Sequence, residues 1–438
     1  MKFYVANNNK RKQVYDILNI FYDHDDLVFD EDASLKVYDK EIIFRERKIG
    51  YEEADLKRTL YELLVKETGY QSPWGYLTGS KPSKLLDKMS PGDLSEKYLL
   101  SDEKLKLLEE IRNQQAKISF DPKDFSIYIN IPFCPTRCKY CAYPTIVGDR
   151  KEKSEYTTSL IYEIENINLP ESLDAIYIGG GTPSFIGEAD LKRLIDALNK
   201  RFTYKEFTFE AGREDTLNTR KLEILRDGGV DRISLNPQSF NKEIVERAGR
   251  TYDYDHFLEI YQRAKDLDFI VNMDFIIGLV GEGSTLFRRN FDLLEKLLPD
   301  NITFHALAMK VGSKYFEGKV RAERGESLKI SQMIEDFVKE NSYRPYYLYR
   351  QKNIVSNLEN VGYERGGTSQ RYNIIINEEK ESIIGLGMNA NTKLMNGKKF
   401  RNSRNLRDYF DKVQREIWAK NEMINEYNKD KHRRNYGN

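Results

Sequence analysis

The chain has 438 residues, of which 39% are hydrophobic and 32% are charged. Its 70 Lys and Arg residues balance 70 Asp and Glu residues, which argues against a protein that coats nucleic acid or an anionic membrane surface. The sequence has no apolar run of about 18 residues and no apolar segment after its first charged residues, so we expect neither a membrane span nor a signal peptide. All three cysteines fall in one short motif, which leaves none for a disulfide and favours a cytoplasmic location.

The first 120 residues are predicted to form a small α/β domain. Apolar residues recur at helical spacing between residues 14 and 21 and again before Gly69. Short strands are expected at 3–5, 35–38 and 41–46, and a further helix at 104–115. No group of catalytic residues occurs in this part, so we interpret it as a cover or a partner-binding domain.

From residue 121 to residue 310 a strand, a loop and a helix follow one another repeatedly. The predicted strands cover 126–131, 175–178, 206–210, 232–236, 269–276 and 301–307. Such repeats are typical of a parallel α/β sheet. Glycines, carboxylates and a histidine fall at the C-terminal ends of nearly all of these strands, where α/β barrels place their sites. An open doubly wound sheet would gather them at one switch point, so the pattern favours a barrel.

After residue 310 the periodicity weakens. We expect a helix at 327–339, a strand at 345–350 and a final helix at 406–421, with a glycine-rich passage at 362–367 and the stretch Ile383-Ile384-Gly385-Leu386-Gly387 between them. Residues 311–438 are predicted to close the open side of the barrel and to shape the substrate entrance. The expected fold is therefore α/β: a partial (β/α)6 barrel with an N-terminal α/β domain and a C-terminal α+β extension.

The cysteine motif, Cys134, Cys138 and Cys141, directly follows the first barrel strand. Thiolates are the usual ligands of iron–sulfur clusters. Three of them can bind three corners of a cubane cluster and leave the fourth iron free for the amine and carboxylate of a small ligand. A structural zinc site normally has four ligands, and none of the four histidines lies near the motif in sequence. Zinc is therefore the weaker alternative.

Other strand ends carry further candidate residues. Gly179, Gly180 and Gly181 precede Thr182, and glycine lets the backbone approach a ligand closely. This run lacks the phosphate-loop and dinucleotide-binding signatures. Glu210 suits a pair of ribose hydroxyls, although an ordinary salt bridge would also explain it.

The fifth and sixth strands end in ionisable residues. Asp274 lies among apolar residues, and because an unpaired buried carboxylate is costly, we expect it to face the barrel mouth with a partner. His305 ends the sixth strand, where it would position a substrate carboxylate or relay a proton. A core histidine is the equally good alternative.

Together these motifs resemble the radical S-adenosylmethionine (SAM) superfamily, and within it the oxygen-independent coproporphyrinogen III oxidase branch. The order Tyr-x-x-Ile-Pro-Phe, Cys-x3-Cys-x2-Cys, Gly-Gly-Gly-Thr-Pro and Arg-Ile-Ser-Leu-x-x-Gln-Ser-Phe is that of the branch. Pro-Trp-Gly-x-Leu-Thr-Gly and Tyr-Tyr-Leu-Tyr-Arg-Gln-Lys-Asn are similar to its longer HemZ-type members. The resemblance runs over most of the chain.

The resemblance implies roles for individual residues. It implies that the cysteines hold a [4Fe-4S] cluster. No residue is assigned a catalytic role, and the candidates for one are His305 and Arg250. The implied contacts to the first SAM are Tyr128, Gly180, Glu210 and Arg250. The implied contacts to a second SAM are Tyr140, Gly181, Thr182, Gln238 and Asp274.

The sequence departs from the branch at several positions. Asn130 stands where a histidine is frequent, and Tyr143 stands in place of a fourth cysteine. The stretch 278–281 lacks the usual proline, and Asn236-Pro237 replaces a pair of small apolar residues. These departures leave the cluster ligands and the first SAM site intact, and they bear on the second SAM and on the tetrapyrrole reaction.

The implied activity is reductive cleavage of SAM to a 5′-deoxyadenosyl radical, which removes hydrogen from a propionate of coproporphyrinogen III before carbon dioxide leaves. The implied partners are a tetrapyrrole, either coproporphyrinogen or haem, and a reduced flavodoxin or ferredoxin-type electron donor. Arg250, Lys310 and Arg350 are predicted to hold propionates. Two alternatives stay open: an anaerobic haem-opening radical SAM methyltransferase and a haem-binding chaperone with the same fold.

Overall fold

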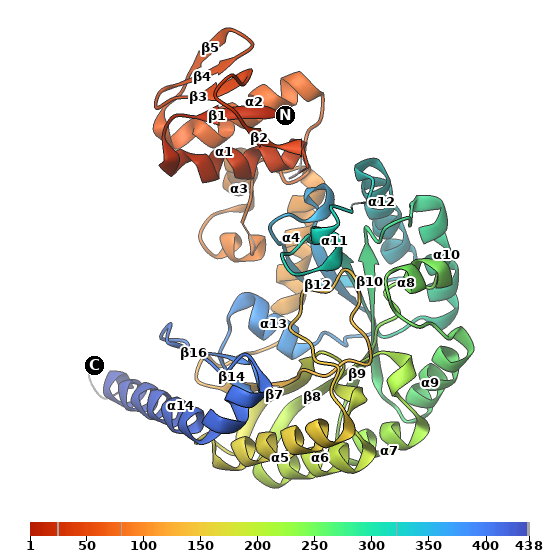
Figure 1. Ribbon diagram of the computed structural model, residues 1–438. Helices are drawn as coiled ribbons and strands as arrows, with labels where there is room; N and C mark the ends of the chain where they lie inside the picture. The colour runs from red at the N-terminus through yellow and green to blue at the C-terminus, as the bar shows by residue number, and fades with distance from the viewer. Residues whose placement is uncertain (24–25, 80, 321, 436–438) are drawn as a thin grey trace.

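The computed structural model describes residues 1–23, 26–79, 81–320 and 322–435 (Figure 1). Its strands form a five-stranded sheet near the N-terminus and an eleven-stranded sheet in the rest of the chain. Within these residues no helix is both long enough and apolar enough to cross a bilayer.

The N-terminal sheet has the order β2-β1-β3-β4-β5. The helices α1 (Asn8–Phe21) and α2 (Leu56–Thr68) pack against each other, and Gly69 ends α2 with φ 70°. Together the sheet and the helices enclose a core of their own that runs from Phe3 to Leu64, seen as the red and orange lobe of Figure 1. The strands are β1 (Lys2–Val5), β2 (Val28–Phe29), β3 (Leu35–Val37), β4 (Glu41–Phe44) and β5 (Arg47–Gly50).

The next segment packs on the large sheet instead of the small one. It contains α3 (Pro91–Tyr98) and α4 (Asp102–Gln115), whose apolar side chains belong to the main core. The indole of Trp74 donates to Glu359 at 2.7 Å, and the ammonium of Lys104 lies 2.7 Å from the same carboxylate. Buried hydrogen bonds to a charged group are among the stronger ones, so this segment is firmly attached to the barrel.

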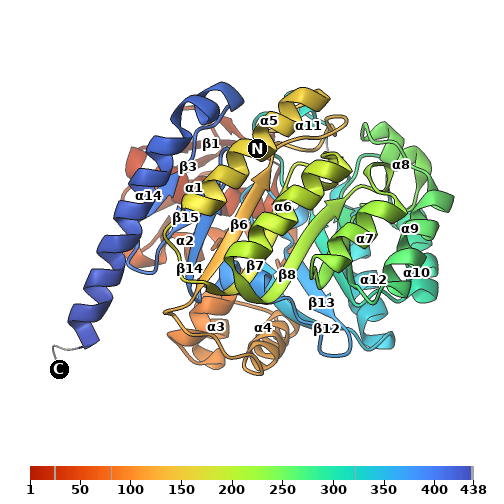
Figure 2. The ribbon, with the colours of Figure 1, turned by 90° about the horizontal axis from the view of Figure 1, so that it is seen from below.

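Six parallel strands form the middle of the large sheet, and each pairs with the next in chain order. This singly wound order is that of a barrel, and all six strands predicted from the sequence are confirmed. Figure 2 shows α5, α6 and α7 side by side over the outer face of the strands. The strands are β6 (Phe125–Ile131), β7 (Ser172–Gly180), β8 (Thr203–Gly212), β9 (Arg232–Leu235), β10 (Ile270–Ile277) and β11 (Asn301–Ala306).

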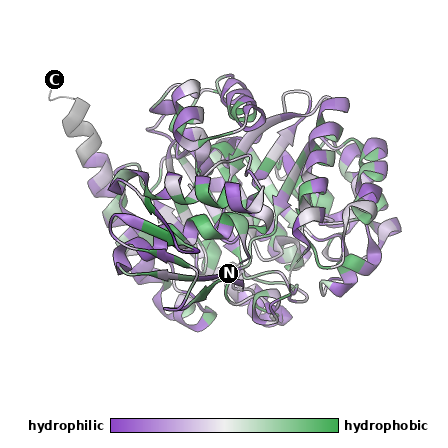
Figure 3. Cartoon of the chain, turned by 90° about the horizontal axis from the view of Figure 1, so that it is seen from above, coloured by the Kyte–Doolittle hydropathy of each residue, from purple (hydrophilic) through white to green (hydrophobic). Residues whose placement is uncertain are grey.

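The helices of the barrel follow the strands in turn. The apolar faces of all but α8 lie in the main core, whereas Ile244 of α8 belongs to a small separate cluster. Figure 3 shows hydrophobic colour on the strands and hydrophilic colour on the outer helix surfaces. They are α5 (Arg150–Asn166), α6 (Glu188–Arg201), α7 (Thr219–Asp227), α8 (Lys242–Arg247), α9 (Tyr254–Asp266) and α10 (Ser284–Leu297).

The C-terminal part adds strands to both edges of the six. β14 pairs parallel with β6, whereas β13 pairs antiparallel with β11 and carries β12 beyond it. The order of the sheet runs from β12 to β16 without closing, which confirms a partial barrel. The added elements are α11 (Lys314–Glu317), α12 (Arg324–Glu340), β12 (Arg344–Tyr349), β13 (Asn360–Glu364), α13 (Arg371–Glu378), β14 (Ser382–Leu386), β15 (Asn391–Lys393), β16 (Lys399–Arg401) and α14 (Leu406–Asn435).

Candidate functional site

The cysteine loop follows β6 and is anchored by backbone hydrogen bonds on both sides. Cys134 donates to Ile146 O at 3.0 Å, and Lys139 donates to Ala248 O at 2.8 Å. Within the loop, Cys141 donates to Cys138 O at 3.2 Å. All three thiols are free and half-buried, so the loop presents three potential sulfur ligands from one short stretch.

The spacing of the three sulfurs separates a cluster from a single ion. Across the described residues, Asp124, Asp174 and Glu381 are the one group of three metal-type ligands whose atoms all lie within 4.8 Å of one another. Two sulfurs on one zinc ion can be no more than about 4.6 Å apart, because each Zn–S bond is about 2.3 Å. As placed here, the three cysteine sulfurs do not all lie within that distance of one another. Three thiols presented from one short loop are the type of ligand that iron–sulfur clusters use.

The glycine run after β7 packs directly behind this loop. Gly181 donates to Ile131 O at 2.8 Å and Thr182 donates to Phe133 O at 2.7 Å. A Cβ atom on Gly181 would lie 2.7 Å from Phe133 O and 3.0 Å from Cys134 Sγ. The hydroxyl of Thr182 lies 3.3 Å from the same sulfur. Glycine is thus required here for the contact between two loops, in addition to any contact with a ligand.

Two cavities meet beside the cysteine loop. The smaller, about 530 Å³, is lined by Tyr140, Cys141 and Lys310 among others, and the larger, about 970 Å³, contains Glu210 and Asp274. We call the larger one the chamber. The residues that line both are Tyr128, Tyr143, His305, Tyr349, Gln351 and Asn391. A ligand bound at the cysteine loop therefore adjoins the chamber.

Ionisable groups line the inner part of the chamber. Tyr177 donates to the carboxylate of Glu210 at 3.1 Å. Burial, and next the nearby carboxylate of Asp274, raise the pKa of Glu210 to about 7. Asp274 accepts from the amide of Asn272 at 2.8 Å, and its other oxygen lies 3.6 Å from His305 Nε2. The structure thus pairs Asp274 with His305, whose Nδ1 lies 3.2 Å from the Tyr349 hydroxyl.

Tyrosine rings form flat walls of the chamber. The rings of Tyr177 and Tyr372 stack with centroids 4.6 Å apart, and Tyr128 stacks against both at 6.1 and 6.3 Å. Tyr347 and Tyr349 also line the chamber, and the planes of their rings differ by 9°. Parallel aromatic surfaces of this kind suit a flat, conjugated ligand.

The remaining residues predicted to contact SAM each have a different set of neighbours in the structure. Gln238 has φ 65°, and its backbone bridges β9 to β10 by donating to Asp274 O and accepting from the Ile276 amide. Its side-chain Oε1 is buried without a hydrogen-bond partner. Tyr140 packs on the small apolar cluster that contains Ile276. Arg250 is buried, donates to Gly212 O at 2.9 Å and lies 3.5 Å from the Glu214 carboxylate.

The prediction that Arg350 holds propionates at the mouth is wrong. Its guanidinium is buried, donates to Leu77 O and donates to Asn357 O at 3.0 Å. It also lies 4.9 Å from the Trp74 ring centre. Two of its partners, Trp74 and Leu77, come from the segment after α2, which the sequence pattern does not place there. Lys310, by contrast, is exposed and lines the smaller cavity.

The sequence pattern does not predict the chamber residues that come from α13 and from the rim. Gln370, Tyr372 and Asn373 line the chamber, as do Lys81, Lys84 and Lys393. Tyr372 follows a glycine-rich stretch, and about 300 positions separate Lys393 from Lys81 and Lys84 along the sequence. No local pattern in the sequence marks either group.

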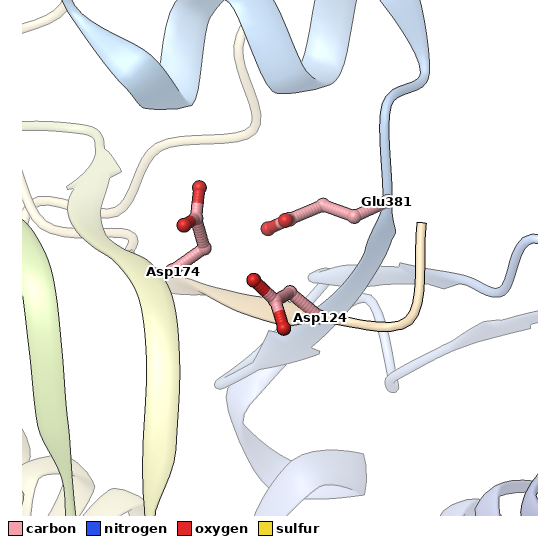
Figure 4. Close-up of side chains that lie close together, drawn as sticks. All are labelled: Asp124, Asp174 and Glu381. Carbon is pink, nitrogen blue, oxygen red and sulfur yellow. The ribbon is translucent and has the colours of Figure 1, made fainter. Parts of the chain in front are cut away.

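A second group of carboxylates lies at the other end of the strands, where Asp124, Asp174 and Glu381 point toward one another (Figure 4). Two cations already neutralise part of it: Lys205 lies 2.6 Å from Asp174 and 3.1 Å from Asp124, and Arg371 pairs with Asp174 at 2.7 Å. Burial raises the pKa of Glu381 to about 8. The charge balance favours a proton on Glu381 over a metal ion.

Comparison with known proteins agrees with this arrangement. Residues 128–293 match the radical SAM superfamily. The chain is 39% identical over 361 residues to the oxygen-independent coproporphyrinogen-III oxidase-like protein HemZ of Bacillus subtilis, covering 76% of this chain and 72% of HemZ. It is 26% identical over 319 residues to the heme chaperone HemW of Lactococcus lactis, covering 69% and 80% of the two chains.

Among solved structures, the coproporphyrinogen III oxidase HemN of Escherichia coli superimposes with a TM-score of 0.57. It is 21% identical and covers 70% of this chain and 73% of HemN. The fold is therefore the α/β radical SAM fold with its parallel sheet. The chain belongs to the radical SAM superfamily, and within it to the oxygen-independent coproporphyrinogen III oxidase-like branch that contains HemZ.

Proposed function

We propose that this chain is a radical SAM oxidoreductase that decarboxylates the propionates of coproporphyrinogen III. Its branch is tetrapyrrole-related, and the single observation that carries the finer assignment is the junction of the two cavities. Six residues line both, so a group bound at the cysteine loop adjoins a chamber of about 970 Å³ with flat aromatic walls. That volume is at the upper end of the range for small-molecule sites.

Membership in the superfamily implies a [4Fe-4S] cluster and SAM. Cys134, Cys138 and Cys141 would hold the cluster, and the chemistry it supplies when bound is one-electron reductive cleavage of SAM. Thr182 and the glycines before it fix the loop behind Cys134. These contacts hold the start of the cysteine loop, next to Cys134, in place.

The chamber residues bind and orient the two substrates. Glu210, once ionised, accepts hydrogen bonds from the ribose hydroxyls of SAM. Tyr128, Gly180 and Arg250 complete this first SAM site, in which Arg250 acts through the Gly212 carbonyl and Glu214 that it already binds. Asp274 and His305 accept hydrogen bonds from the pyrrole N–H groups of the tetrapyrrole.

A second SAM belongs to the same proposal. The buried, unpartnered Oε1 of Gln238 offers an acceptor for it. Tyr140, Gly181, Thr182 and Asp274 are the other contacts that the resemblance implies for this second SAM. Residues 1–120 would form the accessory domain, residues 121–310 the catalytic barrel, and residues 311–438 the extension that shapes the substrate site. A reduced flavodoxin or ferredoxin-type protein is the proposed electron donor.

The test is anaerobic reconstitution with iron and sulfide, followed by reaction with SAM, dithionite and coproporphyrinogen III. The proposal predicts 5′-deoxyadenosine together with vinyl-bearing tetrapyrroles. A methylated linear tetrapyrrole formed from haem would identify a haem-opening methyltransferase instead. Stoichiometric haem binding with neither product would identify a haem chaperone. Protein that binds no iron would contradict all radical chemistry at this loop.

A further inference from the structure

Three lysines stand at the rim of the chamber around one carboxylate. Glu379 forms ion pairs with Lys81 at 3.0 Å, with Lys84 at 2.5 Å and with Lys393. The four side chains are between 31% and 42% exposed, and all four line the chamber. One carboxylate can neutralise one ammonium, so the rim keeps two positive charges in excess.

The inner end of the chamber has the opposite character. Glu210 and Asp274 are carboxylates, and the hydroxyls of Tyr177 and Tyr349 lie beside them. Hydrogen-bond acceptors therefore line the inside, and cations line the entrance. A ligand complementary to both ends is flat, carries N–H donors in its centre and carries carboxylates on its periphery.

The rim is assembled from distant parts of the chain. Lys81 and Lys84 come from the segment after α2, Lys393 ends β15, and Glu379 directly follows α13. The segment after α2 is attached to the barrel through Ser83, whose hydroxyl donates to Glu378 at 2.7 Å. The lysines are therefore held near the chamber by contacts other than their own ion pairs.

We propose that Lys81, Lys84 and Lys393 bind the peripheral carboxylates of the tetrapyrrole substrate, which compete with Glu379 for the three ammonium groups. This inference rests on the proposed function and adds the rim that selects a polycarboxylate. Lysine suits the task because its ammonium is a mobile point charge that can follow carboxylates on flexible side chains. The N-terminal segment thus contributes directly to the substrate site.

A purely structural role for the ion cluster makes different predictions. If the lysines only attach residues 81–84 to β15, their loss lowers stability and leaves substrate discrimination unchanged. Replacing Glu379 separates the two roles most clearly. Its removal weakens a structural cluster, whereas it frees three ammonium groups for a substrate that needs them.

The experiment measures binding of coproporphyrin III, the stable oxidised tetracarboxylate, and of its tetramethyl ester to the reconstituted full chain by fluorescence quenching. We expect K84Q and K393Q each to weaken tetracarboxylate binding about fivefold to tenfold and to leave ester binding unchanged. E379Q should tighten tetracarboxylate binding about threefold. K88Q, an exposed lysine of the same segment outside the chamber lining, is the control and should match the wild type.

Two results would overturn the inference. Equal binding of tetracarboxylate and ester by the wild type, with unchanged values in the lysine variants, would reduce the rim to a structural ion cluster while the proposed function stands. Weaker tetracarboxylate binding by E379Q than by the wild type would also show that the rim is only a structural ion cluster. A wild-type protein that binds neither porphyrin would instead contradict the proposed function itself.

Discussion

The hydroxyl groups of Tyr128 and Tyr143 lie 3.3 Å apart at the junction of the two cavities. Tyr128 also donates to Asn130 Oδ1 at 3.1 Å, and the amide of Asn130 donates to Met388 O at 2.7 Å. Tyr143 and Asn130 are the two positions near the cysteines where the sequence departs from the branch. The structure joins both departures through one tyrosine, so they form a single local arrangement.

This hydroxyl pair predicts that the effects of Y128F and Y143F on the free energy of SAM binding do not add. Y143F removes one hydrogen bond and should weaken SAM binding about fivefold, corresponding to about 1 kcal/mol. The double variant Y128F/Y143F should bind SAM no worse than Y128F alone, because both hydroxyls belong to one contact. SAM dissociation constants of the reconstituted proteins test this, with Y162F on α5 as the control. Strictly additive losses would show that the two hydroxyls act independently.

The cluster ligands are tested by absorbance. C138A should lose the visible absorbance of the reconstituted cluster, because two cysteines leave two corners of a cubane without protein ligands. V147A changes an exposed side chain of the same loop, and this control variant should keep the visible absorbance of the cluster. If C138A retained its full absorbance, the assignment of the cysteines as ligands would be wrong.

Glu210 predicts a pH dependence of SAM binding. Its pKa of about 7 means that the carboxylate, the better acceptor for ribose hydroxyls, becomes fully populated only above neutral pH. The SAM dissociation constant should therefore fall roughly tenfold between pH 6 and pH 8. The other ionisable groups near Glu210 are Asp274, His305 and the tyrosines Tyr177, Tyr128, Tyr143, Tyr349 and Tyr372.

E210Q isolates this effect. The glutamine does not titrate, so the variant should bind SAM weakly and with little change between pH 6 and pH 8. Isothermal titration at several pH values provides the measurement. A wild-type dissociation constant that does not change with pH would contradict the ionisation of Glu210 in the binding step.

Glu381 predicts that the stability of the fold depends on pH. Here the protonated carboxyl is the favourable form, whereas at Glu210 the ionised form is favourable for binding. Its folded pKa of about 8 exceeds the ordinary value of 4.5, so the folded state holds a proton that the unfolded state releases. Its contribution is fully present below about pH 4.5 and decreases by up to about 1.4 kcal/mol per pH unit until about pH 8. Beyond that pH it is lost.

E381Q mimics the protonated acid and should remove the loss of stability that ionisation of Glu381 causes as the pH rises. The melting temperature of E381Q should exceed that of the wild type, and the difference should grow between pH 6 and pH 8.5. E171Q, an exposed glutamate, serves as the control. A variant that melts below the wild type at every pH would indicate that the ionised carboxylate is needed, for instance by a bound cation.

The sequence predicts the barrel well because its strands are buried on both faces. β6 to β11 are runs of β-branched and aromatic residues separated by helices of regular period, and these signals are local. The short strands β2 and β5 escaped prediction, since Val28–Phe29 is exposed and Arg47–Gly50 is largely charged.

The site was predictable only where it coincides with motifs at strand ends. Cys134, Glu210 and Asp274 could be placed because parallel strands end at one edge of the barrel. The rim lysines could not, because tertiary folding brings Lys84 and Lys393 together. Arg350 was misplaced because a positive charge normally stays exposed, whereas here Trp74 and two carbonyl groups satisfy it.

The most direct test of the account uses coproporphyrinogen III that carries deuterium on the propionate β-carbons. The reconstituted protein would be mixed with this substrate, SAM and dithionite without oxygen, and the 5′-deoxyadenosine would be analysed by mass spectrometry. Radical decarboxylation of the propionates predicts deuterium in the 5′-deoxyadenosine and vinyl groups on the tetrapyrrole. Unlabelled 5′-deoxyadenosine together with unchanged tetrapyrrole would contradict it.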